Sequence, residues 1–213
     1  MGVRASDGSG KMVHLLLASS NAGKLREYRE MAAGSGIALD LMPDFRDHPA
    51  FDESAPTFAE IGAAKALHYS RFSDELVLAD DSGLVVPALG GAPGVRSARY
   101  AGPKATDVEN NQKLLREMAG REGEQRRARF VCVTAVTRRG RALAVVSDFA
   151  DGSILSAPRG TGGFGYDPLF LSTDLGCTFA EAAQVQKNRH SHRGKAFAKV
   201  VVLLTAPNSV IPS

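Results

Sequence analysis

The stretch Leu76-Val77-Leu78-Ala79-Asp80-Asp81-Ser82-Gly83 decides the fold, because an apolar run of strand length is followed by two adjacent carboxylates. Such a run is typical of a buried strand, and the Ser-Gly pair predicts that the chain turns directly after the acids. Successive strand residues face opposite sides of a sheet, so only one carboxylate is expected to reach a shared site. Buried acids need a cation or hydrogen bonds. The alternative is a solvated Asp-Asp turn.

The 213-residue chain has the composition of an ordinary globular protein, with 44% hydrophobic and 23% charged residues. No stretch approaches the roughly 18 uncharged apolar residues that a membrane span needs. Residues 1–11 are polar and rich in Gly and Ser, which predicts a disordered tail without a signal-peptide core. We expect residues 12–213 to form a single two-lobed domain.

The two cysteines and the net charge of the chain limit the classes of protein to which it can belong. Cys132 lies in an apolar run and Cys177 follows a glycine, with no CxxC motif, so neither a disulfide framework nor a zinc site is expected. This favours a reducing cytoplasm. The net charge of +3 fits an anionic ligand and is weak evidence for a nucleic-acid surface. The arginine-rich stretches at 126–129 and 138–141 are interpreted as solvated ends of a hairpin.

Hydrophobic periodicity predicts strands that alternate with helices. Thr57 with Glu60 and Thr106 with Glu109 are capping boxes, which open helices ending near residues 72 and 120. Two alternating runs joined by a short connection predict an antiparallel hairpin. The predicted strands are 13–18, 37–42, 76–79, 128–137, 142–149 and a short one near 154–155, with further helices over 25–32 and from about 192. This pattern predicts an α/β fold with a mixed sheet.

The loop Ser19-Ser20-Asn21-Ala22-Gly23-Lys24, after the first predicted strand, is a candidate phosphate-binding segment. Backbone N–H groups and the positive dipole end at a helix start attract phosphate. Two hydroxyls, an amide and a lysine add donors. The P-loop spacing is missing, and Ser and Asn are also ordinary N-caps. An ordinary helix start is therefore the alternative.

A second candidate is the glycine-dense segment Gly160-Thr161-Gly162-Gly163-Phe164-Gly165-Tyr166-Asp167-Pro168. Glycines let the backbone approach a ligand closely, while Phe164 and Tyr166 offer stacking faces. A mobile turn is the alternative.

A third candidate is Lys187-Asn188-Arg189-His190-Ser191-His192-Arg193-Gly194-Lys195, which is predicted to open the last helix. Cations at a helix N-terminus act against the helix dipole, so a bound polyanion or an oxo-rich base would offset that cost. A solvated basic turn and a small RNA-contact patch are the alternatives.

Three charged residues complete the set. Lys65 lies in the helix that Thr57 opens and is either a functional cation or a surface lysine. Asp52 and Glu53 lie in the polar loop before that helix. Glu60 has a structural role as the capping-box partner and is not assigned to catalysis.

Six motifs occur in register along residues 13–204. They are Ser20-Asn21-Ala22-Gly23-Lys24, Thr57-Phe58 with Lys65, Ala79-Asp80-Asp81-Ser82-Gly83-Leu84, Gly90-Gly91-Ala92-Pro93-Gly94 with Ser97-Ala98-Arg99-Tyr100, Gly162-Gly163-Phe164-Gly165-Tyr166-Asp167-Pro168, and Ser191-His192-Arg193-Gly194-Lys195-Ala196. Together they resemble the Ham1/RdgB-type inosine triphosphate pyrophosphatases (dITP/XTP pyrophosphatases). Each motif alone is weak, but six in register are specific.

The resemblance implies a two-lobed α/β fold, with a long mixed sheet flanked by helices and a deep cleft between the lobes. It also implies a cytoplasmic homodimer that requires Mg²⁺ and binds neither nucleic acid nor membrane. The implied reaction is hydrolysis of non-canonical purine nucleoside triphosphates (ITP, dITP, XTP) to the monophosphate and pyrophosphate, which cleanses the nucleotide pool.

Residue roles carry over by motif. Asp81 would act as general base and metal ligand, Glu53 as the second metal ligand, and Lys65 as a catalytic cation. The implied substrate-binding residues are Ser19, Ser20, Asn21, Ala22, Gly23, Lys24 and Ser82 for the phosphates, Phe164, Gly165, Tyr166 and Asp167 for the base pocket, and Lys187, His192 and Arg193 for the purine edge and phosphates.

The chain departs from the family after the helix glutamate. Many relatives carry an Asn at that position, where this chain has Ile61 and then Gly62. One polar contact near the cleft is therefore expected to be missing. Glu53 is placed only by its distance from Thr57 across a variable loop.

Two other functions stay open at this point. A Maf-type nucleotide pyrophosphatase acting on pyrimidine or modified nucleotides would share the chemistry, and comparing ITP with UTP and TTP separates the two. A single-stranded nucleic-acid-binding module would use the arginine-rich hairpin and residues 187–195, with stacking on Phe164 or Tyr166. It would give Asp80 and Asp81 no role and would bind oligonucleotides in a salt-sensitive way without metal.

Overall fold

The structure, a computed structural model, describes residues 12–206 and is built on a six-stranded mixed sheet. The strands are β1 (Val13–Leu17), β2 (Ile37–Leu41), β3 (Leu76–Val85), β4 (Arg127–Arg138), β5 (Arg141–Ile154) and β6 (Phe170–Ser172), in the spatial order β2-β1-β3-β4-β5-β6. β1 pairs in parallel with β2 and β3, and the other neighbours are antiparallel. The predicted mixed sheet and its hairpin are confirmed. The predicted tail at 1–11 lies outside the described residues.

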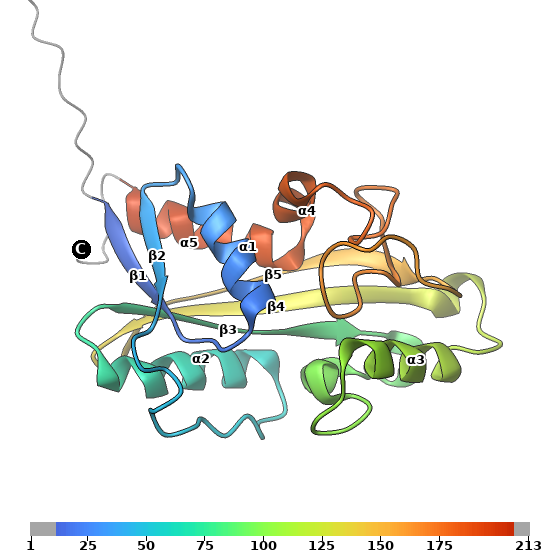
Figure 1. Cartoon of the computed structure of the whole chain (residues 1–213), viewed down its shortest axis with the longest axis horizontal. Helices are drawn as coiled ribbons and strands as arrows, with labels where there is room; N and C mark the ends of the chain where they lie inside the picture. Colours follow the sequence, from blue (N-terminus) through green and yellow to red (C-terminus); the bar gives the residue numbers. More distant parts are fainter. Residues whose placement is uncertain (1–11, 207–213) are drawn as a thin grey trace, which may run out of the picture.

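Helices cover both faces of this sheet (Figure 1). They are α1 (Ala22–Ala32), α4 (Gln184–His190) and α5 (His192–Thr205) on one face, and α2 (Phe58–Tyr69) and α3 (Asp107–Glu117) on the other. The predicted α/β class is thus confirmed. Within residues 12–206, no helix combines the length and apolar character needed to cross a membrane.

The predicted caps form at the starts of α2 and α3. The Thr106 side chain accepts from the Glu109 N–H and the Glu109 carboxylate accepts from the Thr106 N–H, which is the complete capping box. At α2 the Thr57 hydroxyl accepts from the Glu60 N–H, but the Glu60 carboxylate accepts from that hydroxyl instead of the backbone. α2 ends at Tyr69 and continues as a 3₁₀ turn (Ser70–Phe72).

The prediction that β3 ends at the two acids is wrong, because the strand continues to Val85. Its whole length from Val77 pairs with β4, and ladder hydrogen bonds join backbone groups whatever the side chain. β1 pairs with β3 only as far as Leu78, so the acids lie just beyond the end of β1. The turn expected at Ser82-Gly83 is therefore extended strand.

Hydrophobic packing on β3 changes along its length. Leu76 and Leu78 belong to a core cluster with α1 and α5, whereas Val77 and Ala79 face a second cluster under α2. Leu84 belongs to a third cluster beside α3. Residues 80–83 lie between these clusters, and three of them, Asp81, Ser82 and Gly83, line a cavity.

The structure also differs from the sequence-based prediction at one strand and in several short elements. The separate strand predicted near 154–155 is the end of β5, which runs unbroken to Ile154. The short elements β6 and α4 and the 3₁₀ helices Pro87–Leu89 and Gly94–Arg99 were not predicted. Elements of three to seven residues carry too few positions to show a period.

Candidate functional site

A cavity of about 280 Å³ lies where the polar part of β3 faces the loop before α1. It brings together residues that the sequence distributes from position 20 to position 193. The predicted site residues that line it are Ser20, Asn21, Lys24, Glu53, Lys65, Asp81, Ser82, Phe164, Gly165, Tyr166, Asp167, Lys187, His192 and Arg193. Their roles in catalysis and binding stay predictions, but their convergence makes this the candidate active site.

The two adjacent acids of β3 have opposite environments. Asp80 is 1% exposed, and its Oδ2 lies 2.9 Å from Lys24 Nζ and 3.5 Å from Arg193 Nε. Burial alone would raise the pKa of Asp80, but Lys24 and Arg193 hold it well below its usual range. Asp81 lines the cavity. A strand therefore presents one carboxylate of the pair, as its alternation predicts.

Asp81, which lines the cavity, is a carboxyl with a raised pKa. Burial raises its pKa to about 6, with Asp80 and Glu53 adding to the rise and Lys24 opposing it. Its Oδ2 is buried and has no hydrogen-bond partner among the described residues. A carboxyl that is perturbed in this way and keeps a free oxygen is a candidate base or metal ligand.

Glu53 reaches the cavity from the loop before α2 and is held by two cations. Its Oε1 accepts from Lys65 Nζ at 2.6 Å, and its Oε2 lies 3.4 Å from Arg99 Nη1. Burial would raise the pKa of Glu53, but Lys65 and more weakly Lys24 and Arg99 lower it. Glu53 is therefore ionised near Asp81.

A buried cluster of charges contributes Lys187, Asp167 and Arg193 to the cavity wall. Lys187 Nζ is 2.5 Å from both Glu27 Oε1 and Asp167 Oδ2, and Arg193 Nη1 is 2.5 Å from Glu27 Oε2. All four residues are at most 3% exposed. Burial would raise the pKa of Glu27, but Arg193 and Lys187 lower it, so Glu27 binds both cations as a carboxylate. Arg193 Nη2 also donates to the Ser82 hydroxyl at 2.8 Å.

The basic segment at 187–195 differs from its prediction. Lys187 belongs to α4, and α5 begins at His192 with Ser191 as its N-cap. Acidic partners from α1 and the glycine-rich loop, together with Asp80, compensate the buried cations Lys187 and Arg193. No bound polyanion is needed to offset the helix dipole.

Phe164 forms an aromatic wall of the cavity. Its ring centroid is 5.0 Å from Lys187 Nζ and 5.5 Å from Arg193 Cζ. The ring also packs on α1 at Gly23, where an ideal Cβ would lie 2.7 Å from Phe164 Cδ1. Glycine is therefore required at residue 23 for this contact.

His192 adds a second aromatic surface. Its ring is stacked on Phe130 at a centroid distance of 4.7 Å and an interplanar angle of 7°. Burial lowers the pKa of His192 well below its usual value, and Arg193 and Lys187 add to the effect. The imidazole is therefore neutral, and its buried Nδ1 has no hydrogen-bond partner among the described residues.

Three residues of the predicted phosphate loop lie elsewhere. Ser19 is buried, its Oγ accepts from the Asn21 N–H at 3.2 Å, and it lines a neighbouring pocket of about 400 Å³ together with Ala22. Gly23 supports the Phe164 ring. Ile61, where the resemblance implied an Asn, is 1% exposed and packs as an apolar side chain.

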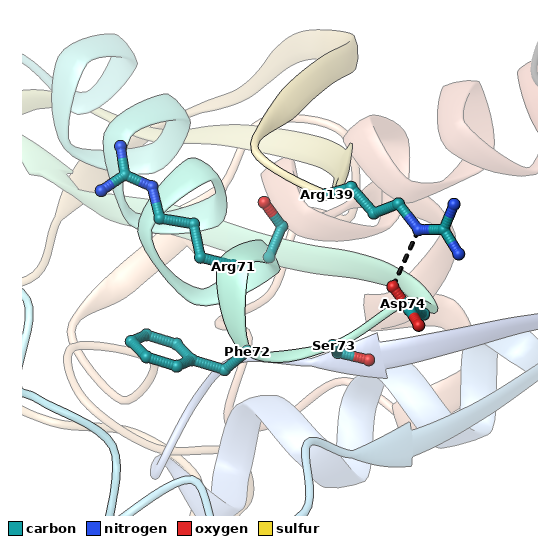
Figure 2. Close-up of a pocket in the computed structure, with 6 residues that line it drawn as sticks. Arg71, Phe72, Ser73, Asp74 and Arg139 are labelled. Atoms are coloured by element: carbon teal, nitrogen blue, oxygen red, sulfur yellow. Dashed lines mark hydrogen bonds and ion pairs between the residues drawn. The ribbon is translucent and has the colours of Figure 1, made fainter.

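Another pocket, of about 550 Å³, lies along the segment between α2 and β3, where Arg139 from the β4–β5 turn joins residues 70–74 (Figure 2). Arg139 Nε contacts Asp74 Oδ1 at 2.8 Å, and Arg71 points away from that pair. Its charged groups therefore do not converge, so the cavity at β3 is the better candidate.

Three residues of the site were not assigned from the sequence. Glu27 looks like a solvated charge in a helix rich in Arg and Glu, although its spacing of three from Lys24 puts both on one helix face. Arg99 lies in a quoted motif but was given no role. Asp107 lines the cavity and looks like an ordinary acid in the first turn of a helix.

Known proteins are similar to this chain over most of its length. A model of the Ham1 family matches residues 15–203. The dITP/XTP pyrophosphatase of Geobacillus kaustophilus is 50% identical over 189 residues, covering 89% of this chain and 93% of the relative. The dITP/XTP pyrophosphatase of Geobacter sulfurreducens is 46% identical over 187 residues, covering 88% of this chain and 94% of that one.

Solved structures show the same fold. A HAM1 protein from Coxiella burnetii has a TM-score of 0.79 at 38% identity and covers 91% of this chain and 99% of its own. The Ham1 protein of Staphylococcus aureus has a TM-score of 0.78 at 32% identity, covering 90% and 97%. The chain therefore belongs to the Ham1 family.

Proposed function

We propose that this chain hydrolyses non-canonical purine nucleoside triphosphates, such as ITP, dITP and XTP, to the nucleoside monophosphate and pyrophosphate. One observation carries the proposal: a single cavity holds Asp81, Lys24 and Lys65 together with the aromatic ring of Phe164. Cations suit a triphosphate, an ionisable carboxyl suits activation of water, and a ring suits a base.

The donor set fits Mg²⁺ as a cofactor. Mg²⁺ is usually bound by one or two carboxylates together with substrate phosphates and waters. Asp81 Oδ2 is buried without a partner, and Glu53 is an ionised neighbour. Within residues 12–206, no group of three or more His, Cys, Asp or Glu side chains could hold a metal ion. Asp81 and Glu53 would therefore hold Mg²⁺ with the substrate supplying further oxygens. When bound, the ion neutralises charge on the leaving pyrophosphate and polarises water.

The residues of the chain supply positioning and proton transfer. Lys24 and Lys65 lie near Asp81 and stabilise the negative charge of the triphosphate. Asp81, once ionised, accepts a proton from the water that attacks the α-phosphorus. Asp80 orients Lys24 by its 2.9 Å ion pair and stays ionised. Asp80 thus supports the site without contacting the substrate.

Base selection is proposed to come from the donors beside the Phe164 ring. Lys187 and Arg193 are donors only, and a 6-keto oxygen accepts from them whereas the 6-amino group of adenine does not. A site that hydrogen-bonds such a group can reject an analogue lacking it by about 10⁴. Their rigid pairing with Glu27 keeps these donors in place.

We expect magnesium-dependent release of pyrophosphate from ITP and XTP, at least about 10³-fold faster in kcat/KM than from ATP. A coupled pyrophosphatase assay over a panel of nucleoside triphosphates measures this, with EDTA as the metal-free control. Equal turnover of ATP and ITP would contradict the specificity, and a preference for UTP or TTP would favour the Maf-type alternative. The buried, paired state of Lys187 and Arg193 speaks against their use as a nucleic-acid surface.

Gly23→Ala tests the place of the Phe164 ring. The added methyl group would meet the ring at 2.7 Å and displace it, so KM for ITP should rise about tenfold. Alanine favours a helix over glycine by about 0.5–1 kcal/mol, so urea unfolding should show no loss of stability. Inhibition by inorganic triphosphate, which has no base, serves as the internal control. An unchanged KM would show that the ring does not bind the base.

The homodimer and the cytoplasmic location implied by the resemblance also belong to this proposal. Sedimentation at assay concentration distinguishes a dimer from a monomer.

A further inference from the structure

Helix α3 holds the loop that carries Phe164. Asp107 Oδ2 accepts from the Gly165 N–H at 2.7 Å, and Asn111 Nδ2 donates to the Gly165 carbonyl oxygen at 2.9 Å. Asp107 and Asn111 are four residues apart, so both side chains lie on one face of α3. The two hydrogen bonds satisfy both backbone polar groups of the residue that follows Phe164.

The conformation of the loop makes this support necessary. Gly163 and Gly165, which flank Phe164, have φ values of +71° and +62°. Glycine is the residue with the greatest backbone freedom, so these two positions do not fix the ring by their own preference. Contacts must do so instead. On the other side of Phe164, its N–H donates to Asp167 Oδ2 at 2.8 Å, and Asp167 pairs with Lys187.

The capping of α3 does not use the Asp107 side chain. The N-cap of α3 is Thr106, and the capping box is complete without the Asp107 side chain. Asp107 is exposed at the helix start, where an acid contributes only modestly through the helix dipole. Its carboxylate nevertheless lies at the cavity, bonded to the Phe164 loop.

We propose that Asp107 and Asn111 are positioning residues for binding of the purine base. They bind the N–H and the carbonyl oxygen of Gly165, and in this way they keep the Phe164 ring against α1 and Lys187. This inference rests on the proposed function, since it assigns the base to Phe164. The proposed phosphate ligands Lys24 and Lys65 pair instead with Asp80 and Glu53, so the two α3 residues should act on base binding alone.

The test compares Asp107→Ala, Asn111→Ala and the double variant with Gln112→Ala, an exposed residue of the same helix. KM for ITP should rise about tenfold in the double variant, with kcat within about threefold of wild type, because base stacking is weakened while the groups proposed to act on the phosphates are unchanged. The inhibition constant of inorganic triphosphate should not change. Asp107→Asn keeps an acceptor oxygen and should show less than half of the rise seen for Asp107→Ala. Gln112→Ala should behave as wild type.

Two results would overturn the inference. One is an unchanged KM for ITP in the double variant. The other is an equal weakening of ITP and inorganic triphosphate together with a lowered Tm, which would indicate general destabilisation. Calorimetric titration with inosine monophosphate gives a readout without turnover. If the wild type releases no pyrophosphate from ITP, the proposed function fails, while the titration still decides whether the two residues position the base.

Discussion

Asp81→Asn should lower kcat for ITP by at least about 10³-fold, because general-base catalysis alone contributes 10² to 10⁴ and the substitution also removes a proposed metal ligand. Asparagine has nearly the shape of aspartate, so the cavity keeps its form. It cannot accept the proton of the attacking water and carries no charge for Mg²⁺. Single-turnover release of pyrophosphate at saturating ITP measures the effect. A variant with substantial turnover would remove Asp81 from the proposed mechanism.

The same substitution should make the metal-free protein more stable at neutral and alkaline pH. The folded-state pKa of Asp81 is about 6, above the unfolded value near 3.8, because burial disfavours the carboxylate. Such a group contributes its full stability below pH 3.8 and loses it as the pH rises through 6. At pH 8 with EDTA, asparagine should therefore raise the free energy of unfolding by roughly 1–3 kcal/mol, and at pH 4 by little.

Urea unfolding across this pH range measures the difference between Asp81→Asn and wild type. Asp74→Asn is the matched control, since Asp74 is exposed and its ion pair with Arg139 contributes little. Adding Mg²⁺ should stabilise the wild type more than Asp81→Asn, because only the wild type keeps both proposed carboxylate ligands. If the difference in stability between Asp81→Asn and wild type does not depend on pH, the ionised Asp81 carboxylate does not destabilise the folded protein.

Glu27→Ala should lower the free energy of unfolding by about 3–5 kcal/mol, which is the usual cost of removing one partner of a buried charge pair. Glu27 is 1% exposed and accepts from Lys187 and Arg193, each at 2.5 Å. Without it, two buried cations share only Asp167 and Asp80. An uncompensated positive charge is then buried where α1 packs against α4 and α5.

Glu30→Ala is the matched control for this prediction. Glu30 lies three residues further along the same helix and is exposed, and its carboxylate accepts from Asn188 Nδ2. Its substitution should change the free energy of unfolding by less than about 0.5 kcal/mol. Glu27→Gln, which keeps the shape and one acceptor, should be intermediate and remain foldable. Equal effects of the Glu27 and Glu30 substitutions in urea unfolding would contradict the role of the buried cluster.

The residues of the candidate site that could be predicted from the sequence are those that belong to a recognisable motif. Lys24, Asp81 and Phe164 were assigned from motifs, and all three line one cavity. Glu27 and Asp107 were missed because the role of an acidic side chain in a helix depends on its burial and its contacts, which the sequence does not show. One is buried against two cations, and the other is exposed and holds a loop from a distant part of the chain.

By itself, the sequence determined the α/β class, the capped helices and the central hairpin, because periodicity, caps and short connections act between neighbouring residues. It also indicated that only one of Asp80 and Asp81 would face a site. Only the tertiary structure decided where β3 ends, since pairing with β4 extends it past the acids. It likewise decided that Lys187 and Arg193 are buried against Glu27, some 160 residues away in sequence. Burial and long-range charge pairing arise when distant segments pack, and no local pattern in the chain encodes them.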